Sequence, residues 1–245
     1  MVLKKAKKIM TEFKSWFSIF YDIGIPKWIP ETLLISIFVM ICLIISSAFL
    51  TRNLKVRNPS KGQILFEMIM KSLVDFVSGL CPSEKKILVP ILGTTFLVIL
   101  FSNYIGIVPG FISSSSNIIL PATLAVMAFF LVQFMGFSRL GFKYLKHFLG
   151  EPIWLAPLNI PVHIVSEIAR PVSLSCRLYG NIYGEEMVIG VLLYIALNIL
   201  PNFLHWVPLQ LPMVFFALFS GFIQAFIFTL LVGLYVDMAI SHEEV

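Results

Sequence analysis

Long uncharged apolar segments constrain the fold of this chain more than any other feature. Residues 32–50, 87–108 and 118–136 contain no Lys, Arg, Asp or Glu. Each approaches the ~20 apolar residues that a helix needs to cross the hydrocarbon layer of a bilayer. The whole chain is 58% hydrophobic and 13% charged, with a mean hydropathy of +0.93, so it is far more apolar than an average soluble domain. These features predict an all-α integral membrane protein.

Two further apolar segments near the C-terminus are longer. Residues 172–200, between Pro171 and Pro201, and residues 211–239 predict helices of roughly 29 residues each, or about 44 Å at 1.5 Å per residue. Because the hydrocarbon layer is only ~30 Å thick, we expect both helices to tilt strongly, as an antiparallel hairpin. The sequence thus predicts a single membrane domain over residues 1–245 with about five membrane helices.

Interfacial helices are predicted outside these spans. Residues 1–30 interleave lysines with apolar side chains and lack the uninterrupted apolar core of a signal peptide, which favours an amphipathic surface helix. In residues 64–80, Glu67, Lys71 and Asp75 recur every four residues and share one face, while the rest of the segment is apolar. We expect both segments to lie in the membrane interface.

The distribution of basic residues predicts the orientation in the membrane. Lys and Arg gather after the first and third spans, which is typical of the cytoplasmic side. This places the N-terminus outside and the C-terminus in the cytoplasm, although the lysines within residues 4–27 oppose the assignment. The net charge of +5 then needs no nucleic-acid partner. The cysteines and histidines show no metal-ligand spacing, so neither a metal nor a cofactor is expected.

Arg177 is a charged residue inside a predicted apolar helix. Of the 18 basic residues, only Arg170 and Arg177 lie beyond residue 146, and Arg177 falls inside a predicted span. A charge at the centre of a membrane helix costs at least ~2.5 to 3.5 kcal/mol. Glu186 cannot offset that cost on the same helix, because nine residues place it about 180° around the axis and ~13 Å along it. Arg170 follows Glu167 by three residues, which suits a local ion pair.

We therefore expect a functional role for Arg177 and a structural role for Arg170. Intramembrane ionisable residues usually mark ion paths, but Arg177 could instead join helices or extend its charge to the membrane surface. Three- and four-residue steps place small and polar residues on the face of Arg177, namely Arg170, Ser173, Asn181 and Gly184. A second such stripe lies in residues 211–239 and comprises Ala217, Ser220, Gly221 and Gln224. Close helix packing explains the small residues but not the arginine.

The residues around Arg177 resemble a known family. PVSLSCRLYGNIYGEEMV at residues 171–188, followed by GFIQAFIFTLLVGLYVDMA at 221–239, is similar to subunit a of the F-type rotary ATP synthase. RNPSKGQ at 57–63 and FSNYIG at 101–106 add weaker similarity in the same order along the chain. The most specific element is the Arg-Leu-aromatic-Gly-Asn core that begins at Arg177.

This resemblance implies a stator that carries ions, H⁺ or Na⁺, to and from a rotating ring of helical hairpins, each bearing a carboxylate. It implies that Arg177 faces the ring carboxylate, that Gln224 lies close to it, and that Asn181 and Glu186 line aqueous half-channels. Some members carry a histidine where this chain has Ala217. As a hypothesis, Glu185 takes its place as the second titratable group. Supporting roles are expected for Arg170, Ser173 and His163, the last beside the inner half-channel.

The implied partners are the c-ring of hairpin subunits, the peripheral stalk subunit b, the F1 catalytic sector indirectly and the lipid bilayer, in a bacterial inner membrane. No catalytic site of its own is expected. An ion-coupled secondary transporter is the alternative, although the chain lacks the internal repeat common in that class. A membrane enzyme is a third reading, which the scattered His, Asp and Ser residues argue against.

Overall fold

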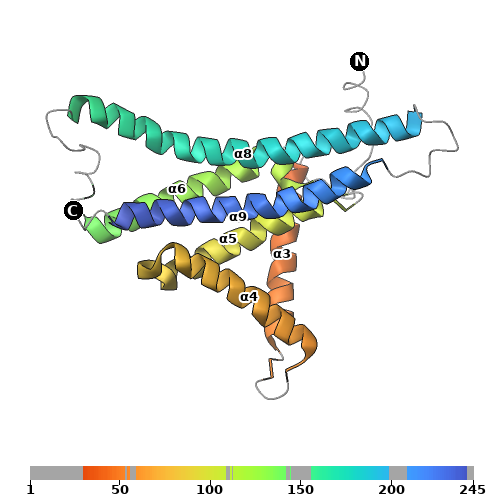
Figure 1. Ribbon diagram of the computed structural model, residues 1–245, viewed down its shortest axis with the longest axis horizontal. Coiled ribbons are helices and arrows are strands. Elements are labelled where there is room, and N and C mark those ends of the chain that lie inside the picture. Colours follow the sequence, from red (N-terminus) through yellow and green to blue (C-terminus); the bar gives the residue numbers. More distant parts are fainter. Residues whose placement is uncertain are drawn as a thin grey trace. The chain divides into compact units, whose positions relative to one another are not determined.

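The structure of the chain is a computed structural model that describes residues 30–52, 54–55, 59–108, 111, 113–141, 144, 156–198 and 209–241. All regular secondary structure within these ranges is helical (Figure 1). The protein therefore has the predicted all-α membrane fold. The interfacial helix predicted for residues 1–30 lies outside the described residues except for residue 30.

The first three predicted spans each correspond to a helix. These are α3 (Glu31–Arg52), α5 (Lys85–Ile105) and α6 (Ile119–Leu140), with α4 (Lys61–Leu80) between the first two. The 3₁₀ turns η1 (Pro82–Glu84) and η2 (Ser114–Ser116) precede α5 and α6. The Ser60 side chain accepts a hydrogen bond from the Gln63 backbone N–H, an N-cap that fixes where α4 begins.

The two C-terminal helices are the longest in the described chain. α8 runs from Ala156 to Asn198 and α9 from Leu211 to Ser241. α8 begins well before the predicted start at residue 172, because it continues through Pro161 and Pro171. Proline usually ends or kinks a helix, but membrane helices tolerate it where neighbouring groups satisfy the freed backbone. The strong tilt and the interfacial position of α4 stay predictions.

Four helical segments are long and apolar enough to cross a membrane: α3, η1 with α5, α6 and α9. The chain is thus a multi-pass membrane protein. α8 is long enough, but Arg177, Glu185 and Glu186 interrupt its apolar character. These are the residues that the sequence marks as functional, so the least apolar of the five predicted spans is the one that carries the candidate site.

The chain forms two compact units, and each is built from separate stretches of sequence. Unit 1 comprises Met1–Ile44, Val98–Leu120 and Arg177–Ala225, and unit 2 comprises Ile45–Leu97, Pro121–Cys176 and Phe226–Val245. The buried core of unit 1 includes Ile35, Val39, Ile99, Leu178 and Ile182. That of unit 2 includes Val77, Leu88, Leu92, Phe228 and Val232. Each unit therefore contains its own apolar interior.

Candidate functional site

Arg177 lies on an exposed face of α8. Asn181 and Gly184, predicted to share this face, are exposed as well, and so is Ser173. A Cβ atom added at Gly180 or Gly184 would meet no other atom within 4 Å, so the surface beside the arginine is open. Arg170, predicted on the same stripe, is only partly exposed.

The charge of Arg177 is not compensated within the part of the chain that the structure describes. Among those residues it forms neither an ion pair nor a hydrogen bond. The two nearby glutamates are engaged elsewhere, and the Glu185 side chain is buried. Because an unpaired guanidinium is costly in an apolar environment, the geometry calls for an anionic partner outside these residues.

Asn181 connects the arginine face to α9 within unit 1. Its Nδ2 donates a hydrogen bond to the Oε1 atom of Gln224 at 3.0 Å. Gln224 is only 3% exposed, whereas Asn181 is exposed. This hydrogen bond therefore links the exposed face of α8 to a polar side chain in the interior of unit 1. Asn181 and Gln224 were both predicted as site residues, each on a different helix.

Glu186 binds a serine-rich loop that precedes α6. Its Oε1 atom accepts a hydrogen bond from the Ser113 backbone N–H at 3.0 Å, and its carboxyl also interacts with the Ser116 side chain. Glu185, one residue earlier, interacts with the side chain of Ser220 on α9. The two acidic side chains thus contact different elements of unit 1.

The serine loop extends this polar network to α5. Ser115 Oγ donates to Asn103 Oδ1 at 2.8 Å, and Asn103 Nδ2 donates to the Gly221 carbonyl oxygen at 3.4 Å. No role was predicted for these serines from the sequence. The signal available was the run of four serines at residues 113–116, an unusually polar but uncharged segment between two predicted spans.

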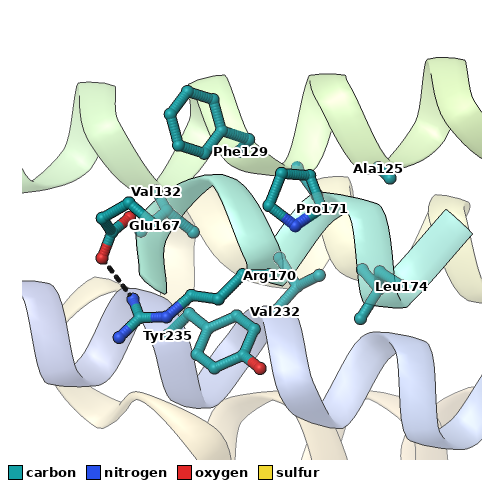
Figure 2. Close-up of a pocket in the computed structure, with 10 residues that line it drawn as sticks. Ala125, Phe129, Val132, Glu167, Arg170, Pro171, Leu174, Val232 and Tyr235 are labelled. Carbon is teal, nitrogen blue, oxygen red and sulfur yellow. Dashed lines mark ion pairs between the residues drawn. The ribbon is translucent and has the colours of Figure 1, made fainter. Parts of the chain in front are cut away.

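Arg170 is compensated within unit 2, as its spacing from Glu167 predicts. Its Nη1 lies 2.6 Å from Glu167 Oε1, and its guanidinium carbon is 4.7 Å from the centre of the Tyr235 ring. Figure 2 shows the guanidinium between the carboxylate and the ring, beside a cavity of about 20 Å³ lined also by Phe129 and Leu174. An ion pair and a cation–π contact together hold this charge.

The Glu167 carboxylate is further held by α6. Gln133 Nε2 donates to Glu167 Oε2 at 2.8 Å, and the Tyr144 hydroxyl donates to Gln133 Oε1 at 2.9 Å. Burial raises the pKa of the Tyr144 phenol above its usual value, so this hydroxyl stays protonated and remains a donor. The whole set of contacts is that of a structural ion pair.

The structure separates the predicted site residues into two groups. Arg177, Asn181, Glu185, Glu186 and Gln224 belong to unit 1, whereas Arg170, Ser173 and His163 belong to unit 2. His163 lies on α8 and is partly exposed. Within the described ranges, no group of three His, Cys, Asp or Glu side chains is arranged to hold a metal ion.

Comparisons with known proteins give one consistent result. Residues 33–237 match the family model described as the ATP synthase A chain. The chain is 40% identical over 184 residues to ATP synthase subunit a of Syntrophobacter fumaroxidans, covering 75% of this chain and 74% of the relative. It is 36% identical over 221 residues to that of Solidesulfovibrio magneticus, covering 90% and 89%. It is 34% identical over 199 residues to that of Geobacter sulfurreducens, covering 81% and 82%.

Proposed function

This chain belongs to the ATP synthase A chain family and is a stator subunit of the membrane sector, and we propose that it translocates ions through two offset half-channels separated by Arg177. In this proposal the exposed face of α8 lies against a rotating c-ring whose hairpins each carry a carboxylate. Passage of H⁺, or of Na⁺, through the half-channels turns the ring, and this rotation is coupled to ATP synthesis.

The observation that carries the proposal is the exposed and unpaired state of Arg177. The guanidinium stands among small residues, and no residue in the described ranges compensates its charge. A partner carboxylate presented by a neighbouring subunit would remove the cost of that charge. The absence of side chains at Gly180 and Gly184, and the open space beside them, allow such a partner to approach closely.

The chemistry of arginine suits a barrier between half-channels. Arg does not release its proton in a protein, so it attracts a carboxylate without relaying a proton. Its charge favours the ionised form of an adjacent carboxylate by about 1.4 to 4 kcal/mol. A ring carboxylate that arrives at Arg177 would therefore give up its ion. Moving one charge through the membrane provides ~2.3 kcal/mol per 100 mV, which is comparable and permits operation in both directions.

The polar network of unit 1 supplies candidate linings for the half-channels. In the proposal Glu186 lines the route from outside, and Asn181 with Gln224 lies beside the ring carboxylate. Ser173 and His163 are assigned to the cytoplasmic side, and Arg170 supports that part of α8.

Glu185 is proposed as the second titratable group of the outer half-channel, in place of the family histidine at Ala217. Its interaction with Ser220 on α9 supports this assignment, because Ser220 belongs to the same stripe as Ala217. Glu185→Gln should then slow pumping markedly. Unchanged pumping in this variant would remove Glu185 from the mechanism.

The remaining parts of the proposal rest on family membership and, for the orientation, on the distribution of basic residues. We propose that the chain resides in the cell inner membrane with the N-terminus outside and the C-terminus in the cytoplasm. Its partners would be the c-ring, the peripheral stalk subunit b and, indirectly, the F1 sector. Copurification tests this directly, because a secondary transporter would be isolated without a hairpin ring or soluble ATPase subunits.

The decisive test is ATP-driven acidification of inverted membrane vesicles. We expect the native complex to acidify the vesicles and Arg177→Ala to abolish acidification, with the complex still assembled. The responses to Na⁺ and to a protonophore identify the translocated ion. Pumping by assembled Arg177→Ala complex would refute the proposed role of this residue.

A further inference from the structure

The serine loop and α5 meet at a glycine within unit 1. A Cβ atom added at Gly106 would lie 2.6 Å from the Ser113 Cβ and 2.9 Å from the Ser113 backbone nitrogen. Both neighbours belong to the backbone or are rigidly attached to it, so no side-chain rotation relieves the overlap. Only glycine therefore permits this approach of the loop to the end of α5.

The same loop is held in place by hydrogen bonds of its own. Ser113 Oγ donates to the Ser102 carbonyl oxygen at 3.0 Å, and Ser116 Oγ donates to the Ser113 carbonyl oxygen at 2.7 Å. Ser113, Ser114 and Ser115 are almost completely buried. The backbone N–H of Ser113 consequently has a fixed position from which it donates to Glu186.

We propose that Gly106 and Ser113 are positioning residues for Glu186: the missing side chain at residue 106 seats the loop against α5, and the seated loop holds the Glu186 carboxylate through the Ser113 N–H. The inference rests on the proposed function, in which Glu186 exchanges ions with the outside. It assigns a role to two residues for which the sequence predicted none. A carboxylate held by a backbone donor keeps one orientation and favours its ionised form.

Two substitutions at one residue isolate this hydrogen bond. Ser113 has φ −60° and ψ 134°, which proline adopts without strain. Ser113→Ala and Ser113→Pro both remove the hydroxyl, but only Ser113→Pro removes the N–H. In Ser113→Pro the ring Cδ also occupies the place of the amide hydrogen, so the Glu186 carboxylate is both deprived of its donor and kept away from this nitrogen. The difference between the two variants therefore reports the contact of the Ser113 nitrogen with Glu186 and not the anchoring of the loop by its hydroxyl.

The readout is the pH dependence of ATP-driven pumping in inverted vesicles that contain the whole complex. Glu186 must be ionised to accept an ion, so the acid limb of the profile reports how tightly it holds a proton. Without this donor, the ionised form of Glu186 is less favoured. The acid limb of the Ser113→Pro profile should therefore lie at higher pH than that of the Ser113→Ala profile, by roughly half a pH unit to one pH unit. Glu185, the titratable neighbour of Glu186, is unchanged in both variants.

Gly106→Ala provides a second and independent variant. It should displace the loop and shift the acid limb in the same direction as Ser113→Pro. Gly93→Ala is the matched control on α5, because a Cβ there would meet only the Leu73 side chain at 3.9 Å. We expect the Gly93→Ala profile to coincide with that of the native complex.

A uniform loss of pumping at every pH, with no shift, would give the loop a purely structural role and overturn the inference. Failure of both Ser113→Pro and Gly106→Ala to assemble with the ring would do the same. These outcomes are separate from failure of the proposed function, which would appear as continued pumping by Arg177→Ala.

Discussion

Two arginines seven residues apart on α8 have opposite environments. Arg170 pairs with Glu167 and stacks on Tyr235, and its charge is satisfied within unit 2. Arg177 is exposed and has no charged or hydrogen-bonding partner among the described residues. Two arginines on one helix thus differ: the charge of Arg170 is paired, and the charge of Arg177 has no partner among the described residues. This contrast supports our proposal that a carboxylate of another subunit compensates the charge of Arg177.

The surroundings of the two arginines differ in kind as well. Around Arg170, the contacts run from Tyr144 through Gln133 to the Glu167 carboxylate, so each polar group is used to hold the ion pair. In unit 1 the Glu186 carboxylate accepts a hydrogen bond from a neutral donor, the Ser113 N–H, and Glu185 interacts with the Ser220 side chain. A carboxylate that is not paired with a cation can exchange an ion. The Glu167 carboxylate, which is paired with Arg170, cannot.

We expect the largest difference in pumping between the two arginines when each is replaced with lysine. Arg177→Lys keeps the charge but loses the planar fork and can deprotonate, so we expect nearly complete loss of coupled pumping. Arg170→Lys should retain most of the pumping, because a lysine still pairs with Glu167. ATP-driven acidification, normalised to the amount of assembled complex, measures both. Equal losses in the two variants would show that the ion pair at Arg170 is not merely structural.

Removing the partner of Arg170 tests the structural side of the comparison. Glu167→Ala leaves a half-buried guanidinium without its carboxylate, and we expect a destabilisation of roughly 1 to 3 kcal/mol. The double variant Glu167→Ala/Arg170→Ala should recover part of the loss, since no charge is then left unpaired. Thermal unfolding of the purified complex in detergent gives the order of stability. A double variant less stable than Glu167→Ala would contradict the pairing.

A smaller difference is expected for two amides, the buried Gln224 and the partly buried Gln133. Gln224→Leu removes the hydrogen bond to Asn181, and Gln133→Leu removes the one to Glu167. Each should cost ~0.6 to 2 kcal/mol of stability. Only Gln224→Leu, however, should lower the pumping rate by several fold, because only Gln224 lies in the proposed ion path. Similar pumping rates in the two variants would argue against that placement.

The smallest effect concerns thiol reactivity. Cys176 is exposed beside Arg177, whereas Cys81 is buried, and burial raises the pKa of the Cys81 thiol. Because the thiolate is the reactive form, maleimide should label Cys176 in the isolated subunit much faster than Cys81. In the complex with the ring, labelling of Cys176 should slow. Labelling at Cys176 that the ring does not slow would place this face of α8 away from the rotor.

Local features of the chain were predictable from sequence. The apolar lengths of residues 32–50, 87–108 and 118–136 indicated α3, α5 and α6, and the i, i+3 spacing indicated the Glu167–Arg170 pair. The start of α8 was not predictable in the same way. A proline at residue 171 favours a break, and whether the helix continues depends on how surrounding groups satisfy the freed backbone.

The candidate site, too, was predictable from the sequence only in part. Hydrophobicity and helical periodicity act over neighbouring residues, so the amino-acid sequence was enough to predict a helical membrane protein and to show that Glu186 cannot pair with Arg177 on the same helix. The fold was needed to show that Glu186 binds Ser113, 73 residues away, and that Asn181 binds Gln224, 43 residues away. Such contacts depend on which helix faces pack together, and that is set by the whole chain and not by any one segment.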